Sequence, residues 1–310
     1  MIKVRIPATS ANLGPGFDCM GMALDLWNTF ELQPQSGEPG VLVELFGEGA
    51  SGLPTDHTNM VAQTMLAELA RLKELSGQTS NLQMPNSFRI ICHNDIPCAS
   101  GMGSSSTAVL AGLIFAHGLA NGCVDIKTVL DRATALEGHG DNVAPALYGG
   151  LILISYDGET VVAERVALPP LQVVACVPTF NFLTSEARAA LPRALSRADA
   201  VYNIGRAMLV AEALRNGDDD LLARAMADRI HEPYRIPLIP GAAHARHAAL
   251  AQGAIAVSLS GAGPGLLAYA RHSHEAIGQA MQAAFNHAGL KARYWVLDAS
   301  PQGAEICIEM

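Results

Sequence analysis

The spacing of apolar residues in the first third of the chain predicts strands and one long amphipathic helix. Short runs that alternate or are rich in β-branched residues predict strands at residues 2–7, 41–45 and 88–92. From about Asn59 to Leu75, the apolar residues recur every three or four positions, which is typical of a helix with one buried face. We therefore expect both strands and helices in this part of the chain.

The same patterns continue to the end of the chain without a regular strand-helix-strand repeat. They predict helices over 104–119, 126–136 and 274–287, a mostly helical stretch over 185–250 with breaks at 216–220 and 232–241, and strands at 149–156, 160–168 (after a turn at 157–159), 169–178, 254–260, 265–270 and 294–299. This irregular order favours an α+β fold over a doubly wound parallel sheet. The Pro169–Pro170 pair is the expected domain boundary, which gives domains over 1–168 and 169–310.

Composition indicates a folded globular protein and excludes several function classes. Half of the 310 residues are hydrophobic and 16% are charged, which is enough apolar surface for a full core. The net charge is −9, and the chain has only four lysines, which are scattered. An extended nucleic-acid surface needs clustered basic residues, so we expect no nucleic-acid partner. A small anionic ligand remains compatible, because backbone amides bind phosphate without side-chain charge.

The cysteines and the hydropathy pattern give an expectation for the cellular compartment. The six cysteines form no CxxC or CxxxC pair, so a disulfide framework or structural zinc site is not expected. The start, MIKVRIPATS, lacks the apolar core of a signal peptide, and no apolar run approaches the roughly 18 residues of a membrane span. We therefore expect a cytoplasmic protein without a membrane partner.

The segment PCASGMGSSST, residues 97–107, is the first candidate for chemistry. Its small residues would let backbone N–H groups approach a phosphate, and the helix predicted to follow adds unpaired N–H groups. The segment matches neither GxxxxGK[ST] nor GxGxxG. From its spacing alone, a serine that caps a buried helix explains the segment equally well.

Three further segments share this polar, glycine-rich character. They are ATSANLGPGFD (8–18), EGHGDN (137–142) and LSGAGPG (259–265). A single such loop is usually only a turn. Four of them in one chain exceed what turns alone lead us to expect, and together they favour a phosphate-binding site over the capping interpretation.

These segments together resemble the GHMP small-molecule kinases, and among them the homoserine kinases most closely. The motifs are PATSANLGPGFDCMGMAL, IPCASGMGSSSTA, EGHGDNVAPALYGG and SLSGAGPG, supported by TSEARAALP and DRIHEPYR. The resemblance implies a two-domain fold: an N-terminal half like domain 2 of ribosomal protein S5 and a ferredoxin-like C-terminal half, with the active site between them. It implies ATP-dependent phosphorylation of the homoserine side-chain hydroxyl, in threonine biosynthesis, with ATP and Mg²⁺ as cofactors. It leaves a homodimer open.

The resemblance also implies which residues bind the nucleotide and the metal. The loop that would wrap the phosphates comprises Pro97, Cys98, Ala99, Ser100, Gly101, Met102, Gly103, Ser104, Ser105, Ser106 and Thr107. Asn59 matches a family position near the adenine. Ser105 matches a magnesium ligand, and a count of eleven residues back from Asn142 gives Asp131 as the second ligand, where the family has Glu. Glu137 is the alternative to Asp131.

On the substrate side, the matching residues are Asn12, Asp18, Asn142, Arg188 and Arg235. Homoserine offers an ammonium group for Asp18, a carboxylate for the two arginines and a hydroxyl near Asn142. Arginine can hold a carboxylate through two parallel hydrogen bonds, which also fixes its orientation.

The resemblance implies a mechanism that depends on positioning. Relatives such as mevalonate kinase have an aspartate at the position of Asn142, and an amide cannot act as a general base. Catalysis by positioning and charge stabilisation suits a loose phosphoryl-transfer transition state, with Asp141 as the alternative base. Two other functions stay open: a GHMP kinase for mevalonate-type or shikimate substrates, and a non-catalytic regulator with the same fold.

Overall fold

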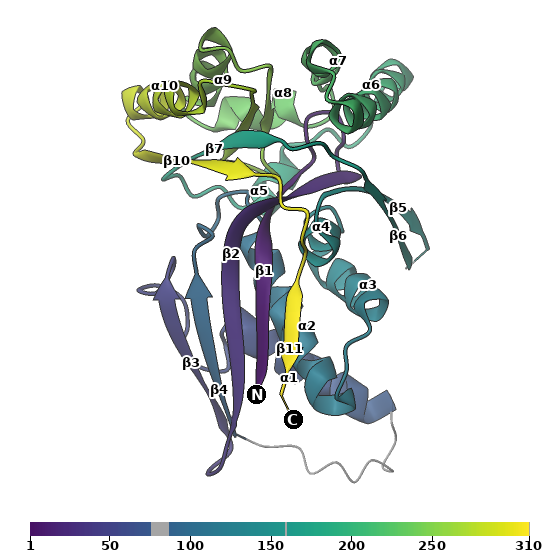
Figure 1. Ribbon diagram of the computed structural model, residues 1–310, viewed down its shortest axis with the longest axis vertical. Coiled ribbons are helices and arrows are strands. Elements are labelled where there is room, and N and C mark those ends of the chain that lie inside the picture. The colour runs from purple at the N-terminus through teal and green to yellow at the C-terminus, as the bar shows by residue number, and fades with distance from the viewer. Residues whose placement is uncertain (76–86, 159, 310) are drawn as a thin grey trace.

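A computed structural model of the chain describes residues 1–75, 87–158 and 160–309, which form two stacked halves (Figure 1). The first half is built on a seven-stranded sheet in the order β11-β1-β2-β4-β3, with β5 paired to β2 and β6 paired to β5. Its strands are β1 (Ile2–Ala11), β2 (Met20–Gln35), β3 (Gly40–Gly47), β4 (Ser87–Asn94), β5 (Leu151–Asp157), β6 (Thr160–Val166) and β11 (Glu305–Ile308). Among the strand pairs of the described residues, β3–β4 alone is parallel.

Four helices bury the inner face of this sheet. They are α1 (Met60–Leu75), α2 (Ser104–Asn121), α3 (Ile126–Glu137) and α4 (Val143–Tyr148). Helix α2 is apolar almost all round and lies at the centre of the core, where Leu110, Leu113 and Ile114 are fully buried with Val4 and Ile6 of β1. A helix that is apolar on all sides is typical of the interior, so α2 is held in place from every direction.

The second half is a four-stranded antiparallel sheet in the order β10-β7-β9-β8. The strands are β7 (Gln172–Pro178), β8 (Ala256–Leu259), β9 (Leu266–Tyr269) and β10 (Ala292–Asp298), and the helices are α5 (Thr184–Ala189), α6 (Arg197–Asn216), α7 (Asp219–Ala225), α8 (Glu232–Arg235), the 3₁₀ turn η2 (Ile236–Leu238), α9 (Ala242–Ala251) and α10 (His274–His287). Numbered within this half, the strand order is 4-1-3-2 and the chain runs β-helices-β-β-α-β. That is the ferredoxin-like plan expected from the sequence.

The α+β class is confirmed, and the predicted helices and strands are present. The expected break at 232–241 instead contains α8 and η2, and two strands are additions. The sequence patterns did not predict β2 or β11. The expected turn at 157–159 joins β5 to β6, but Glu159 lies outside the described residues. Strand β11 returns to pair with β1, so the last residues of the chain lie in the first sheet although they follow Pro169–Pro170. The boundaries 1–168 and 169–310 stay predictions.

The two halves share a buried core at their junction. Apolar residues from the end of β1 and from β2, including Ala8, Met20 and Met22, pack in one cluster with Val173 of β7 and Val210 of α6. The loops at the ends of these elements therefore meet in fixed positions. Within the described ranges, none of the helices combines the length and the apolar character needed to cross a bilayer.

Candidate active site

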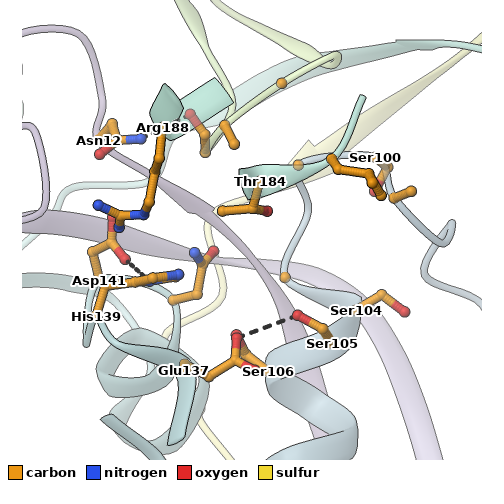
Figure 2. Close-up of a pocket in the computed structure, with 18 of the residues that line it drawn as sticks. Asn12, Ser100, Ser104, Ser105, Ser106, Glu137, His139, Asp141, Thr184 and Arg188 are labelled. Atoms are coloured by element: carbon orange, nitrogen blue, oxygen red, sulfur yellow. Dashed lines mark hydrogen bonds and ion pairs between the residues drawn. The ribbon is translucent and has the colours of Figure 1, made fainter. Parts of the chain in front are cut away.

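A cleft of about 420 Å³ lies where the two halves meet, and it is lined by all four glycine-rich segments (Figure 2). The segment 97–107 forms one wall and leads directly into α2. Its backbone is held from outside by Thr9, whose N–H donates to the Met102 carbonyl, and by Gly265, whose N–H donates to the Ser100 carbonyl. The segment is therefore a fixed loop between strand ends from both halves.

Two glycines in this loop are required by its conformation. Gly101 and Gly103 have φ of 79° and 73°, in the left-handed region that favours glycine. A Cβ on Gly101 would lie 2.1 Å from the Ser260 carbonyl oxygen, and one on Gly103 would lie 2.2 Å from Thr9 Oγ1. A side chain at Gly101 would force the backbone to move, and one at Gly103 would displace the Thr9 side chain.

The first turn of α2 leaves its backbone N–H groups directed at the cleft. Gly103 is the N-cap residue, and no side chain caps this end of the helix. The serine cap considered from the sequence is therefore not what the structure shows. An uncapped helix start with several free N–H groups and a positive dipole end is suited to an anion such as phosphate.

Glu137 at the end of α3 faces these serines across the cleft. Its Oε2 accepts a hydrogen bond of 3.2 Å from Ser105 Oγ and one of 2.8 Å from Ser106 Oγ (Figure 2). Asp131 does not share this arrangement. Its carboxylate pairs with Lys127 at 2.6 Å and accepts a hydrogen bond from the Val161 amide, on the side of α3 that faces β6.

The position of Asp131 has a simple explanation. A count of eleven residues back from Asn142 assumes a long segment between the acidic residue and the asparagine. Here α3 ends at Glu137, and only the segment from Gly138 to Asp141 lies between Glu137 and Asn142. The structure thus brings Glu137, the alternative from the sequence, to Ser105.

A second cavity of about 290 Å³ adjoins the loop on its other side. It shares Met60, Ala99, Ser104 and Ser105 with the main cleft. Asn59 lines it but uses its amide locally, donating to the Pro54 carbonyl at 2.8 Å and accepting from the Val61 N–H at 3.0 Å. Asn59 therefore shapes the wall of this cavity and starts α1. Cavities of this kind, apolar with a few polar groups, are typical of ligand sites.

The opposite end of the cleft holds the charged residues predicted to bind substrate. Arg188 of α5 makes two hydrogen bonds to the Asp18 carboxylate, at 2.9 and 3.1 Å. Burial opposes the charge of this guanidinium, but the hydrogen bonds and charge of Asp18 raise the pKa of Arg188 above its ordinary value. Asn12 fixes the loop beneath, accepting from the Asp18 N–H at 2.9 Å and donating to the Gly261 carbonyl at 2.7 Å.

Arg235 is one of the largest fully buried side chains in the described chain. Burial, followed by the charge of Arg188, lowers the pKa of Arg235 to about 10, so it stays a cation at neutral pH. Both guanidinium groups lie over the Phe17 ring, at 5.2 Å for Arg235 and 5.9 Å for Arg188. The ring face attracts cations, which helps two arginines to share one end of the cleft.

Asn142 and Asp141 lie in the cleft, but their side chains have different partners. Asn142 Oδ1 accepts a hydrogen bond of 2.9 Å from Thr9 Oγ1. Asp141 Oδ1 lies 2.6 Å from His139 Nδ1. Burial of the His139 ring favours its neutral form, but the hydrogen bond and charge of Asp141 outweigh this and raise the pKa of His139 above its ordinary value.

Sequence reasoning missed several residues that shape the site. Thr9 and Phe17 lie inside the quoted segment 8–18, yet neither residue type signals its role, and their partners are far away in the sequence. His231 also shapes the site, because its Nε2 lies 2.8 Å from the Gly14 carbonyl, where it holds the loop of Asp18. Short-range patterns carry no signal for such contacts.

Comparisons with known proteins agree with this geometry. Two family models match the chain: the GHMP kinases N terminal domain over residues 60–150 and the GHMP kinases C terminal domain over 210–287. The homoserine kinase of Moorella thermoacetica is 39% identical over 307 residues, which cover 99% of this chain and 100% of the relative. The homoserine kinase of Desulfitobacterium hafniense is 40% identical over 308 residues, with the same coverage.

Solved structures show the same relationship. A homoserine kinase crystal structure from Cytophaga hutchinsonii matches with a TM-score of 0.82 and 31% identity, over 99% of this chain and 97% of the other. A mevalonate kinase from L. major matches with a TM-score of 0.69 and 18% identity, over 97% and 96% of the two chains. At that identity, the second match shows a common fold only.

Proposed function

This chain belongs to the homoserine kinases, a family within the GHMP kinases, and on that basis we propose how its cleft transfers the γ-phosphoryl group of ATP to the side-chain hydroxyl of L-homoserine. The product is O-phospho-L-homoserine, an intermediate of threonine biosynthesis. The reaction needs a nucleotide and an amino acid side by side. The cleft provides an uncapped helix start at one end and paired charges at the other.

The observation that carries this proposal is that one cleft holds both kinds of site with Asn142 at their junction. Asn142 Oδ1 lies 3.3 Å from the position that a Cβ on Gly103 would take, so the amide borders the phosphate loop. The charge of the adjacent Asp141 acts on both Arg188 and Arg235. A hydroxyl and a γ-phosphoryl group held at the two ends would therefore meet beside residues 141 and 142.

The amino-acid end matches the zwitterionic part of homoserine. We assign the substrate carboxylate to Arg188 and Arg235, and the ammonium group to Asp18. Since Arg188 and Asp18 now satisfy each other at 2.9 Å, a bound zwitterion would insert its two charges between them and keep both paired. Shikimate and mevalonate carry a carboxylate but no ammonium group, so a carboxylate that takes Arg188 from Asp18 would leave Asp18 without a cation.

The phosphate end fits ATP and a magnesium ion. Backbone N–H groups from about Ser100 to Thr107 would bind the phosphates, and the neighbouring 290 Å³ cavity would take the base. Glu137 and Ser105 are hard oxygen donors, and magnesium typically takes one or two carboxylates together with phosphates and waters. When bound there, the ion would offset the charge of the phosphate oxygens.

The residues in the cleft support phosphoryl transfer through positioning of the two substrates. The Oδ1 of Asn142 is occupied by Thr9, and its Nδ2 makes no hydrogen bond within the described ranges, so that N–H donor faces the reaction site. We propose that Nδ2 orients the homoserine hydroxyl towards the γ-phosphorus. In a loose transition state the bond to the ADP oxygen breaks ahead of full bond formation to the hydroxyl, so the hydroxyl proton leaves late and can pass to an oxygen of the transferred phosphoryl group. Asp141, paired with His139, is the alternative base.

A coupled assay of ADP release tests the proposed function. Homoserine, serine, threonine, mevalonate and shikimate are compared at equal concentration with ATP and Mg²⁺, and we expect homoserine to give by far the highest kcat/KM. A preference for mevalonate or shikimate would indicate another GHMP kinase. Absence of ADP with every substrate, while ATP still binds, would indicate a non-catalytic regulator.

A further inference from the structure

His231 lies behind Arg235 at the amino-acid end of the cleft, and its side chain is fully buried. It does not line the cleft itself, and it directly precedes the short helix α8 that ends at Arg235. A buried polar ring needs partners for its nitrogens, because an unpaired buried donor or acceptor is costly. Both nitrogens of His231 have a partner, and the two partners belong to different parts of the proposed homoserine site.

The partners of the His231 ring fix where its proton lies. Nε2 is 2.8 Å from the Gly14 carbonyl oxygen, which can only accept, so the proton is on Nε2. The Asp228 carboxylate, 3.8 Å from the same nitrogen, favours the same assignment. Nδ1 then keeps a lone pair and lies 3.4 Å from Nη1 of Arg235, which can only donate. A second proton on Nδ1 would face the Arg235 guanidinium, so this geometry requires the neutral ring.

The backbone around His231 is fixed by Asp228, whose side chain is also fully buried. Asp228 Oδ2 accepts hydrogen bonds from the N–H groups of His231 at 2.8 Å and Glu232 at 2.7 Å. Its Oδ1 accepts a hydrogen bond of 2.6 Å from Asn203 Nδ2. The His231 ring packs against Phe17, with 5.3 Å between the two ring centroids. The ring therefore has little freedom to turn, and its Nδ1 is held in one position.

Arg235 uses two of its nitrogens inside the fold and keeps further donors for a ligand. Its Nε donates to the Ala187 carbonyl at 3.2 Å, and its Nη1 donates to His231. Its Nη2 makes no hydrogen bond to any residue that the structure describes, and Arg235 lines the cleft. Two fixed acceptors at different nitrogens set the plane of a guanidinium and thus the direction of its remaining N–H groups.

We propose that His231 is a positioning residue for Arg235: the lone pair on Nδ1 orients the guanidinium so that its free N–H groups meet the carboxylate of the amino-acid substrate. This inference rests on the proposed function, which assigns the substrate carboxylate to Arg188 and Arg235. Since an arginine makes parallel hydrogen bonds to a carboxylate only when its planar fork is aligned, His231 contributes to the selection of substrates that carry a carboxylate.

Two amide substitutions separate the two contacts of the ring. Asparagine places its amide near the position of Nδ1 and can accept from Arg235, whereas glutamine reaches the position of Nε2 and can donate to the Gly14 carbonyl. We expect His231→Gln to raise the KM for homoserine about tenfold or more, with kcat and the KM for ATP within about twofold of the wild type. His231→Asn should keep most of the wild-type KM. The reverse ranking would overturn the proposal, because it would show that His231 acts through the loop of Asp18.

A double-mutant cycle tests whether His231 acts through Arg235. Lysine at position 235 keeps the positive charge but has no planar fork that needs alignment. In the background of Arg235→Lys, His231→Gln should therefore lower kcat/KM for homoserine by no more than about twofold, although it costs about tenfold or more with arginine present. Losses that simply multiply in the double variant would overturn the proposal, since the two residues would then act independently.

A second buried histidine provides the matched control. His117 of α2 is buried as well, and its Nε2 lies 3.2 Å from Glu68 and outside the cleft. His117→Asn should lower the melting temperature and leave the KM for homoserine unchanged. An equal rise of KM in the His117 and His231 variants would overturn the proposal in favour of general destabilisation. A wild type that releases no ADP with homoserine would instead reject the proposed function, whereas an active wild type with an unchanged His231→Gln variant would reject this inference alone.

Discussion

Asn142 and Asp141 are adjacent in the chain, and their contacts assign them different tasks. Asn142 is oriented by Thr9 beside the phosphate loop, while Asp141 is paired with His139 and acts on the arginines. We expect Asn142→Ala to lower kcat by about 10²–10³, the usual cost of losing one oriented donor in the transition state. Asp141→Asn should cost clearly less. Steady-state kinetics with homoserine measures both, and the opposite ranking would identify Asp141 as the catalytic base.

Glu137 and Asp131 give a second test at the scale of single residues. Because Glu137 faces Ser105, we expect Glu137→Gln to raise the Mg²⁺ concentration needed for half-maximal activity by roughly tenfold or more. Asp131→Asn is the matched control on the same helix, and its magnesium titration should stay close to that of the wild type. If Asp131→Asn shifted the titration instead, the family count of eleven residues would be correct.

These residues show what could be inferred before the structure was known. Motifs identified Asn12, Asp18, Asn142, Arg188 and Arg235, and all five line one cleft. They could not distinguish Glu137 from Asp131, because that choice depends on where α3 ends and on which side each carboxylate points. The pairing of Asp18 with Arg188 joins residues 170 positions apart, and local sequence patterns do not encode it.

At the scale of elements, the phosphate loop depends on glycines that fix the start of α2. Gly101 and Gly289 have similar φ values of 79° and 84°, so alanine would be strained at both by about 1–2 kcal/mol. Only at Gly101 would the new Cβ strike a backbone oxygen, whereas nothing lies within 4 Å at Gly289.

Comparing alanine substitutions at Gly101 and Gly289 therefore separates the effect of backbone strain from the effect of displacing the phosphate loop. Gly289→Ala should lower the melting temperature slightly and leave the KM for ATP unchanged. Gly101→Ala should lower the melting temperature further and raise the KM for ATP at least tenfold, because the loop must move. Equal effects of the two substitutions on KM would show that the loop tolerates displacement.

The two missed strands show the limits of local patterns for elements. The first residues of β2 are buried on both faces, so Met20–Leu24 lacks the alternation that marks a strand. Strand β11 has only four residues, and its partner β1 lies about 300 residues earlier in the chain. Helix α2, by contrast, was predicted within two residues of its end because its apolar run is long and is followed by glycine.

At the scale of the whole molecule, side chains as well as the shared core join the two halves. Arg188 of the second half pairs with Asp18 of the first at 2.9 Å, inside the cleft. Arg293 of β10 pairs with Glu48, which follows β3, at 2.8 Å and outside the cleft. Both ion pairs cross between the halves, but only one lies where homoserine would bind.

This difference gives a test that links the substrate to the assembly of the halves. A ligand that binds only the folded protein stabilises it in proportion to the logarithm of its concentration over Kd. We expect homoserine to raise the melting temperature of the wild type and of Arg293→Ala equally, since Arg293 contacts no part of the cleft. Arg188→Ala should lose most of the homoserine shift, because the substrate carboxylate loses a two-point contact, while its shift with ATP stays intact. A melting-temperature shift with homoserine that survives Arg188→Ala would place the amino acid elsewhere. An equal loss of this shift in Arg293→Ala would mean that the ion pairs joining the halves, rather than contact with the substrate, govern binding.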